Sequence, residues 1–309
     1  MKRYFRVMLG KGSMYATECV AGNFIGVDYS IDQDLTGKLT EEWRAFNKQF
    51  IPIYLAKHPG KSRISAGLAC GALWTVAKGM QKGDIIFSPD GKGNYRVGKV
   101  TGDYYYAPGQ ILFHRRAVEW LPTVFEHDAT PKSLQRAGSA GTVSDITSYA
   151  QEMESLIAGE PAATANTATV PEDGDPAIFS LEKHLEDFLV SNWENTDLGK
   201  NYAIFEEDGK KKGQQFNTGS TGQIDILAVS KDNKRLLVIE LKRGRASDIV
   251  VGQILRYMGY VKDELLETGQ EVEGMIIALE DDKNLRLAIS MVPSISFYRY
   301  ELNFKLVKG

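Results

Sequence analysis

The sequence is poor in cysteine and has no long hydrophobic run. Its 309 residues include two cysteines, Cys19 and Cys70, and no CxxC pair. Neither a disulfide framework nor a zinc site is indicated, and free thiols in a reducing cytoplasm are expected. No apolar run of about 18 residues occurs, and the basic start MKRYFRVMLGKG has no apolar segment behind it. We therefore expect a cytoplasmic protein with no membrane partner.

Histidine and nucleotide-binding motifs are scarce as well. The four histidines show neither HxH nor HxxxH spacing, which argues against zinc-dependent or HNH chemistry. No GxxxxGK[ST] motif occurs, so any nucleotide-driven motor would be a separate chain. The net charge is −3, and a strongly basic overall composition, which would favour nucleic-acid binding, is absent. A local basic surface remains compatible with this balance.

The length exceeds what one core usually fills, so two domains are expected. Between them the segment AGEPAATANTATVPEDGDPA is small, polar and acidic, without hydrophobic periodicity. We therefore predict a first domain over 1–157 that ends in a helix, a linker over 158–177 and a second domain over 178–309. No internal repeat is visible.

The second domain has an α/β order. FSLEKHLEDFLVSNW predicts a helix over about 181–192, with Ser180 as a candidate N-cap. QIDILAVS and RLLVIELK predict two strands joined by the polar turn KDNK. A second amphipathic helix, SDIVVGQILRYMGYVKDEL, and the strand patterns EGMIIALE and ISFYRYELNF follow. A mixed sheet flanked by helices is expected.

Charged residues interrupt the apolar strand pattern LLVIELK. Glu240 and Lys242 stand two residues apart, so their side chains leave the same face, and Asp225 lies in the preceding strand. Two carboxylates that converge with the backbone carbonyl of Leu241 would form a hard oxygen site for Mg²⁺ or Mn²⁺. The ammonium of Lys242 would position an attacking water or stabilise charge on a phosphate. The alternative is a structural ion pair at a strand edge.

The spacing of these charged residues resembles the core of the PD-(D/E)xK nucleases: Asp225 is followed, after fourteen residues, by Glu240-x-Lys242. The stretch TGQIDILAVSKDNKRLLVIELKRGRAS…VVGQILRYMGYV is similar to the NucS-type endonuclease domain in particular. This resemblance, over about 178–309, implies that Glu186, or alternatively Glu182, joins the metal site. It also implies that Gln253 and Tyr257, like a QxxxY feature, orient the site or a phosphate. Arg243 and Arg245 are candidate phosphate contacts, with a solvated strand end as the alternative.

The first domain is predicted to contain a strongly bent β-barrel with helices. Residues 83–121 alternate strand-like runs with glycine turns. Together with NFIGVDYSIDQDL and GALWTVAKGMQKGD, this segment resembles the PUA-like superfamily, close to EVE domains and the readers of McrB-type restriction systems. The resemblance implies a pocket for an extruded modified base. Its first candidates are Phe24, Asp28, Tyr29 and Trp74, each of which could instead be a core or turn residue.

These patterns together predict a modification-dependent DNA endonuclease of the type IV restriction class, acting in antiviral defence. Its partner would be double-stranded DNA that carries a modified base, and it would pair as a homodimer at least on DNA, since one site cuts one strand. One alternative keeps the nuclease but has it act, like NucS-type enzymes, on mismatched or branched DNA. The other is a non-catalytic protein that binds modified nucleic acid.

Overall fold

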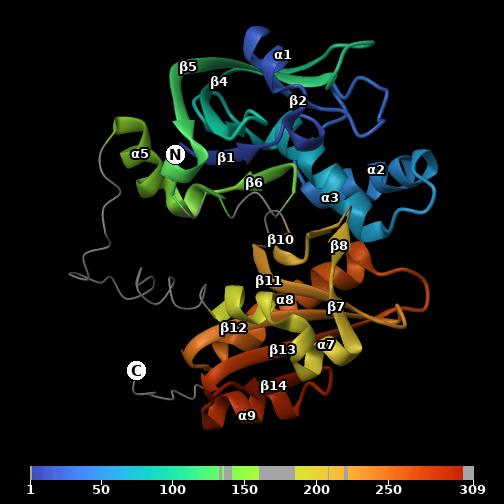
Figure 1. Ribbon diagram of the computed structural model, residues 1–309. Helices are drawn as coiled ribbons and strands as arrows, with labels where there is room; N and C mark the ends of the chain where they lie inside the picture. Colours follow the sequence, from blue (N-terminus) through green and yellow to red (C-terminus); the bar gives the residue numbers. More distant parts are fainter. Residues whose placement is uncertain are drawn as a thin grey trace. The chain divides into compact units, whose positions relative to one another are not determined.

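The computed structural model describes residues 2–131, 134–135, 141–159, 185–207, 209–218 and 222–301. The chain divides into two compact units, Met1–Thr164 and Ala165–Gly309 (Figure 1). Most of the predicted linker, residues 160–177, lies outside the described residues. Within the described ranges, no helix combines the length and the apolar character that crossing a membrane requires.

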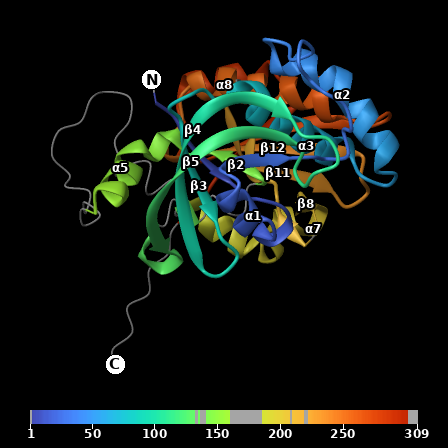
Figure 2. The same cartoon turned by 90° about the horizontal axis from the view of Figure 1, so that it is seen from above.

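Unit 1 is built on a curled six-stranded sheet with the strand order β2-β5-β4-β3-β1-β6 (Figures 1 and 2). Its strands are β1 (Tyr4–Val7), β2 (Phe24–Val27), β3 (Ile85–Pro89), β4 (Asn94–Tyr106), β5 (His114–Glu126) and β6 (Val143–Asp145). β1 and β3 run parallel, and the other paired strands run antiparallel. The register between β4 and β5 shifts twice, and such bulges bend a sheet. The predicted bending is therefore present.

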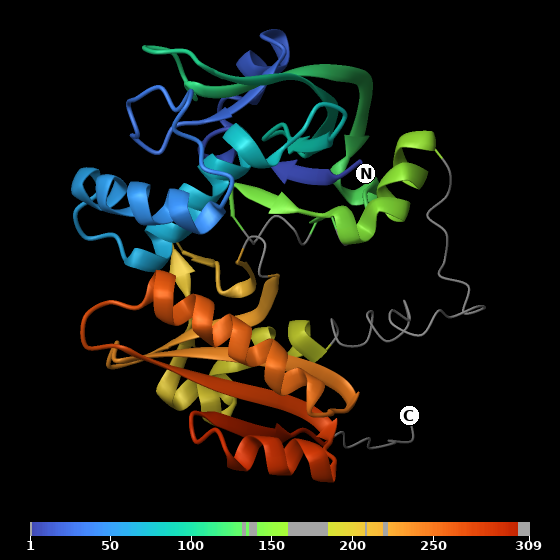
Figure 3. The same cartoon turned by 180° about the vertical axis from the view of Figure 1, so that it is seen from behind.

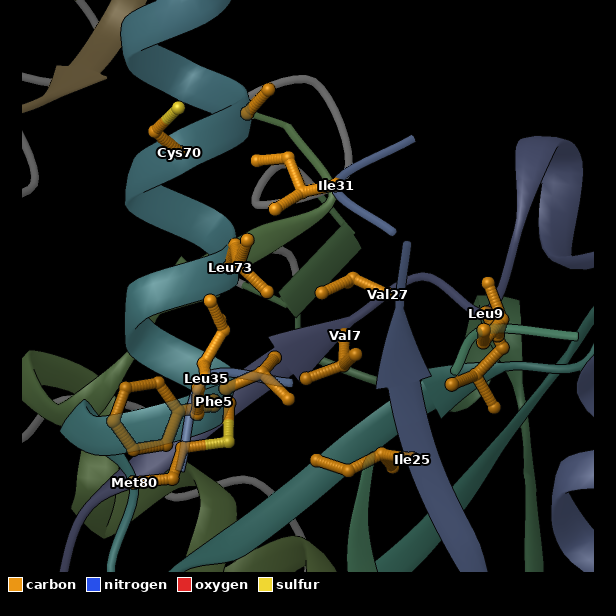
Figure 4. Packing of buried hydrophobic residues seen from close by; sticks show 14 of the residues in the cluster. Phe5, Val7, Leu9, Ile25, Val27, Ile31, Leu35, Cys70, Leu73 and Met80 are labelled. Atoms are coloured by element: carbon orange, nitrogen blue, oxygen red, sulfur yellow. The ribbon is translucent and has the colours of Figure 1, made fainter. Parts of the chain in front are cut away.

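Helices cover both faces of this sheet. They are α1 (Ala16–Ala21), α2 (Trp43–Lys57), α3 (Arg63–Trp74) with the π-helical turn η2 (Thr75–Gly79), and α5 (Ala150–Ala158). The larger core lies between the sheet and α3, where Phe5, Val7, Val27, Leu73 and Met80 pack together (Figure 4). A smaller core lies on the other face, around Tyr95 and Met153. The predicted terminal helix of this unit is confirmed as α5; it begins at Ala150 because Val143–Asp145 joins the sheet as β6.

Helices α2 and α3 are not among the elements predicted from the sequence. They pack closely because α3 carries small residues on the side that faces α2. A Cβ atom added at Gly71 would lie 2.8 Å from the ring of Trp43. The lack of a side chain at Gly71 therefore makes room for that ring.

Unit 2 contains a second mixed sheet with the order β10-β11-β12-β13-β14, and β7 also pairs with β11. Its strands are β7 (Tyr202–Ile204), β10 (Gln214–Asn217), β11 (Gln223–Ser230), β12 (Arg235–Arg245), β13 (Glu271–Glu280) and β14 (Ile295–Arg299), beside the small hairpin β8 (Glu206–Glu207) and β9 (Lys210–Lys211). The predicted antiparallel pair is confirmed as β11 and β12. β12, β13 and β14 run parallel, because α8 (Ile249–Tyr260) and α9 (Lys283–Ser290) connect them as crossovers.

The two faces of the second sheet carry different helices (Figures 1 and 3). A helical segment over 185–191, with α7 (Asp197–Asn201), covers the face formed by Ile226, Ile239 and Met275. Helix α8 covers the other face: a Cβ atom added at Gly274 would meet the side chains of Met258 and Ile254. Residues alternate between the faces along a strand. The residues next to Ile226 and Ile239 along their strands therefore point toward the α8 side.

Candidate active site

Asp225 and Glu240 lie side by side where the pairing of β11 and β12 ends. The antiparallel register joins Ile226 to Ile239, so the next residues, Asp225 and Glu240, face each other. Directly opposed residues share one face of an antiparallel pair. The backbone N–H of Leu241 donates to Oδ2 of Asp225 over 2.7 Å. The carboxylate of Asp225 is thereby tied to the strand that carries Glu240.

Lys242 completes this group. Its Nζ lies 2.9 Å from Oε1 of Glu240, and the Glu240 side chain is only 2% exposed. In the parallel partner β13, the residues beside Glu240 and Lys242 are Ile276 and Ala278. A buried carboxylate among apolar neighbours needs a cation or donors to offset its desolvation, and the ammonium of Lys242 is one such partner. The sequence-predicted triad therefore stands together on the α8 face.

The predicted pair, Gln253 and Tyr257, lies on α8, the helix that covers the face of the sheet carrying the triad. The two residues are four apart on the helix and therefore lie on one face. Nε2 of Gln253 donates a hydrogen bond to the hydroxyl of Tyr257 over 3.4 Å. A Cβ atom added at Gly222, just before β11, would lie 2.8 Å from that hydroxyl. Gly222 has a φ of 116°, which disfavours other residues. Tyr257 therefore sits against the start of the strand that carries Asp225.

Glu186 stands apart from the triad. It is buried in the helical segment 185–191, whose Leu185 and Leu189 pack on the opposite face of the sheet. Nε2 of Gln214 donates to its Oε1 over 2.7 Å, and Nε2 of Gln215 donates to its Oε2. Among the described residues, no three carboxylate, histidine or cysteine side chains are grouped closely enough to hold a metal ion. Glu182, the alternative, lies outside the described residues.

Arg243 and Arg245, which follow the triad in the sequence, are among the last residues of β12. Arg245 is exposed and stands in register with Glu280 after a shift in the pairing with β13. The side chain of Arg243 is outside the described part of the chain. The backbone therefore places both arginines at the end of the strand that carries Glu240 and Lys242.

The donor set of the triad suits magnesium. Asp225, Glu240 and the carbonyl of Leu241 offer hard oxygen atoms and no sulfur or imidazole. Mg²⁺ keeps several waters and is commonly bound by one or two carboxylates plus substrate phosphate. Two carboxylates without a third acid are compatible with this mode of Mg²⁺ coordination. The residues present therefore fit Mg²⁺ or Mn²⁺ better than a closed zinc site.

In unit 1, Phe24 and Trp74 serve packing. Phe24 is 5% exposed, and the guanidinium of Arg115 lies 3.8 Å from its ring centre. Trp74 is partly buried against the larger core, and its Nε1 donates to the carbonyl of Thr40 over 3.1 Å. Neither ring presents two open faces to a base.

Two arginines at the start of β5, Arg115 and Arg116, are also structural. The side chain of Arg115 donates to the carbonyls of Leu112 and Ile111 over 3.2 and 2.6 Å. Arg116 donates to the carbonyls of Val76 and Ala77 in the π-helical turn η2, which follows α3. Because both guanidinium groups are buried in these contacts, they are not a basic surface for phosphates.

The Tyr29 turn is the more exposed of the candidate pocket positions. Asp28 and Ile31 close it with a backbone hydrogen bond of 3.1 Å, and Tyr29 and Ser30 have φ values of 47° and 57°. Two successive non-glycine residues in the left-handed region are strained, a state that proteins often keep at functional sites. Asp28 and Tyr29 are half-buried.

Sequence reasoning missed two aromatic neighbours of this turn. The ring of Tyr54 lies edge-on to Tyr29, with centres 6.4 Å apart, and the His58 ring lies 4.3 Å from that of Tyr54. Nε2 of His58 is 3.4 Å from the carbonyl of Tyr29. The four-residue spacing of Tyr54 and His58 in YLAKH was the available signal. Only the fold brings them to Tyr29.

Comparisons with known proteins give limited guidance. Residues 5–147 match a family described as a domain of unknown function (DUF8426). No curated protein matches the chain.

Among solved structures, the chain is similar to EndoMS in a complex with double-stranded DNA, at 14% identity and a TM-score of 0.33, over 72% of this chain and 66% of that one. It is also similar to a repair endonuclease from Pyrococcus abyssi, at 16% identity and a TM-score of 0.32, over 69% of this chain and 66% of that one. The restriction endonuclease MspJI in complex with a 27-mer oligonucleotide gives 9% identity and a TM-score of 0.24, over 81% and 62%. The chain thus spans just under two thirds of the length of the first two structures.

Proposed function

We propose that this chain is a metal-dependent DNA endonuclease in which unit 2 hydrolyses phosphodiester bonds and unit 1 recognises a modified base. The observation that carries the proposal is the triad: Asp225 and Glu240 face each other across two strands, and Lys242 contacts Glu240 on the same face. An acid pair with an adjacent ammonium, placed where the pairing of two strands ends, is suited to phosphodiester hydrolysis.

Each residue of the site has a distinct role in this proposal. Asp225, Glu240 and the carbonyl of Leu241 would hold Mg²⁺, which when bound supplies Lewis-acid polarisation of the scissile phosphate. The contact between Leu241 N–H and Asp225 fixes one carboxylate before substrate arrives. Lys242, held 2.9 Å from Glu240, would orient the attacking water and stabilise the negative charge that develops on the phosphate. Gln253 and Tyr257 would orient that phosphate.

The recognition step would use the Tyr29 turn. Tyr29, Tyr54 and His58 form an aromatic group, and the segment 57–63 beside it contributes Lys57, Lys61 and Arg63. An aromatic face can stack on an extruded base, and nearby cations suit the flanking phosphates. The carboxylate of Asp28 could accept a hydrogen bond from an exocyclic amino group. A cut through both strands would require two copies of the chain on the DNA.

Variants of the triad test the catalytic half. Asp225→Asn and Glu240→Gln should each abolish cleavage while the melting temperature and DNA affinity stay near those of the native chain. Lys242→Met should also abolish cleavage, but with a lower melting temperature, because it leaves the buried Glu240 carboxylate without its cation. Asp263→Asn, a matched change at an exposed acid of unit 2, should leave cleavage unchanged. EDTA should stop cleavage, and Mg²⁺ or Mn²⁺ should restore it. Metal-independent cutting by the Glu240→Gln variant would rule out the assignment.

Substrate comparison tests the recognition half. The full chain should cleave duplexes with modified cytosines faster than plain or mismatched duplexes of the same sequence. Tyr29→Ala should remove roughly 1–3 kcal/mol of binding to modified duplex, the usual scale for stacking on an aromatic ring, and little of the binding to plain duplex. Tyr105→Ala, at an exposed tyrosine of β4, is the matched control. Preference for mismatched over modified duplex would instead support a repair function.

A further inference from the structure

The Tyr29 turn is held from the interior of unit 1 by a buried histidine. His114, the first residue of β5, is fully buried, and its Nε2 lies 2.9 Å from the carbonyl of Ile31. Ile31 is the residue whose N–H closes the turn on Asp28. Because a carbonyl can only accept, Nε2 of His114 carries the proton and donates it. The last residue of the turn is therefore fixed to the sheet.

Tyr104 of β4 binds the other nitrogen of the same imidazole. Its hydroxyl lies 3.0 Å from Nδ1 of His114. Burial lowers the pKa of His114, so the ring is neutral under physiological conditions and its Nδ1 accepts from the tyrosine hydroxyl. That hydroxyl in turn accepts from the backbone N–H of Leu35 over 3.1 Å. A continuous series of hydrogen bonds therefore ties both ends of the segment 31–35 to the sheet.

The turn needs such support because its backbone is strained. Tyr29 and Ser30 both have left-handed φ values, which non-glycine residues keep only where surrounding contacts impose them. His114 holds the carbonyl that follows this pair, and Nε2 of His58 lies 3.4 Å from the carbonyl of Tyr29 itself. The residues on either side of Ser30 are thus each contacted by an imidazole from a different part of the fold.

The register of the sheet places His114 for this role. It stands opposite Val27, the last residue of β2 before the turn, and opposite Tyr106 of β4 on its other side. The ring of Tyr104 is stacked near the imidazole, with centres 5.9 Å apart. The sheet itself therefore presents both side chains to the segment that begins at Asp28.

We infer that His114 and Tyr104 are positioning residues for base recognition, which fix the Tyr29 turn in its binding conformation before DNA arrives. A preformed site avoids the cost of ordering the turn on binding, so loss of this support should weaken the hold on an extruded base. The effect should fall on modified duplex and spare plain duplex, since neither residue supplies a cation to the phosphates. This inference rests on the proposed role of Tyr29 in recognition.

Tyr104→Phe tests the inference, because it keeps the ring and removes only the hydroxyl. Amide hydrogen exchange of the full chain without DNA, followed by mass spectrometry, should show faster exchange in the segment 31–35. Fluorescence anisotropy well below the melting temperature should show a loss of affinity for modified duplex of roughly 3-fold to 10-fold, the scale of one hydrogen bond. The affinity for plain duplex should not change. Tyr105→Phe, the same substitution at the exposed neighbour, is the matched control and should resemble the native chain in both measurements.

A pair of variants at the histidine tests rescue by a conservative change. His114→Gln keeps an amide that can donate to the carbonyl of Ile31, so it should retain more affinity for modified duplex than His114→Phe. Native exchange or native affinity for modified duplex in Tyr104→Phe would overturn the inference, and so would an equal loss on both duplexes, which indicates a structural role alone. Native affinity for modified duplex in Tyr29→Ala would instead overturn the proposed recognition site itself.

Discussion

Replacing Trp74 with alanine is expected to destabilise unit 1 and to weaken binding to all DNA alike. A tryptophan buries about 150–250 Å² when enclosed, and Trp74 is partly enclosed by the larger core. At about 25 cal/mol per Å², half to two thirds of that area corresponds to about 2–4 kcal/mol. Loss of the hydrogen bond from Nε1 to the carbonyl of Thr40 adds about 1 kcal/mol. The expected loss in the free energy of unfolding is therefore about 3–5 kcal/mol.

Urea unfolding followed by far-UV circular dichroism measures this loss. Trp74→Phe is the matched variant: it keeps most of the buried ring but lacks the N–H, so about 1–2 kcal/mol should be lost. Fluorescence anisotropy on modified and plain duplexes then compares the affinities of the folded fractions. A Trp74→Ala chain with native stability that loses affinity for modified DNA alone would refute the packing role and return Trp74 to the base-binding surface.

Three further predictions concern buried groups. Burial lowers the pKa of His114 below its ordinary value of 6.5, so the folded state binds fewer protons than the unfolded state. The free energy of unfolding should therefore be full above about pH 7.5 and fall as the pH drops through 6.5. His114→Gln should flatten that dependence in calorimetry from pH 7.5 to 5.5. Burial raises the pKa of Cys19 and Cys70 to about 12, so Ellman's reagent at pH 8 should label neither thiol in the native chain and both after denaturation; fast native labelling would contradict the packing. Gly222→Ala should cost roughly 1–3 kcal/mol in urea unfolding, because its φ is positive and Tyr257 lies close; an unchanged midpoint would show that the turn can relax.

Burial in unit 1 decided the roles of several residues that the sequence singled out. The sequence names Phe24 and Trp74 as candidate base contacts, but it does not specify whether these rings face a core or a partner. The fold places Arg115 over Phe24 and packs Trp74 against the larger core, where its Nε1 donates to the carbonyl of Thr40. The burial of these rings is set by segments distant in the sequence, so no pattern along a short stretch of the chain predicts it.

In unit 2 the placement of the triad follows from the sequence pattern. Strand periodicity puts Glu240 and Lys242 on one face, and a short polar turn places β11 against β12, so Asp225 is brought opposite Glu240 by local pairing alone. Helix α9 escaped prediction because it is eight residues long and exposes Leu287. The contact of Tyr257 with Gly222 and the two-glutamine hold on Glu186 were decided only by tertiary structure. They depend on how helices pack across the sheet and on a left-handed residue in β10, and neither follows from the spacing of residues along the chain.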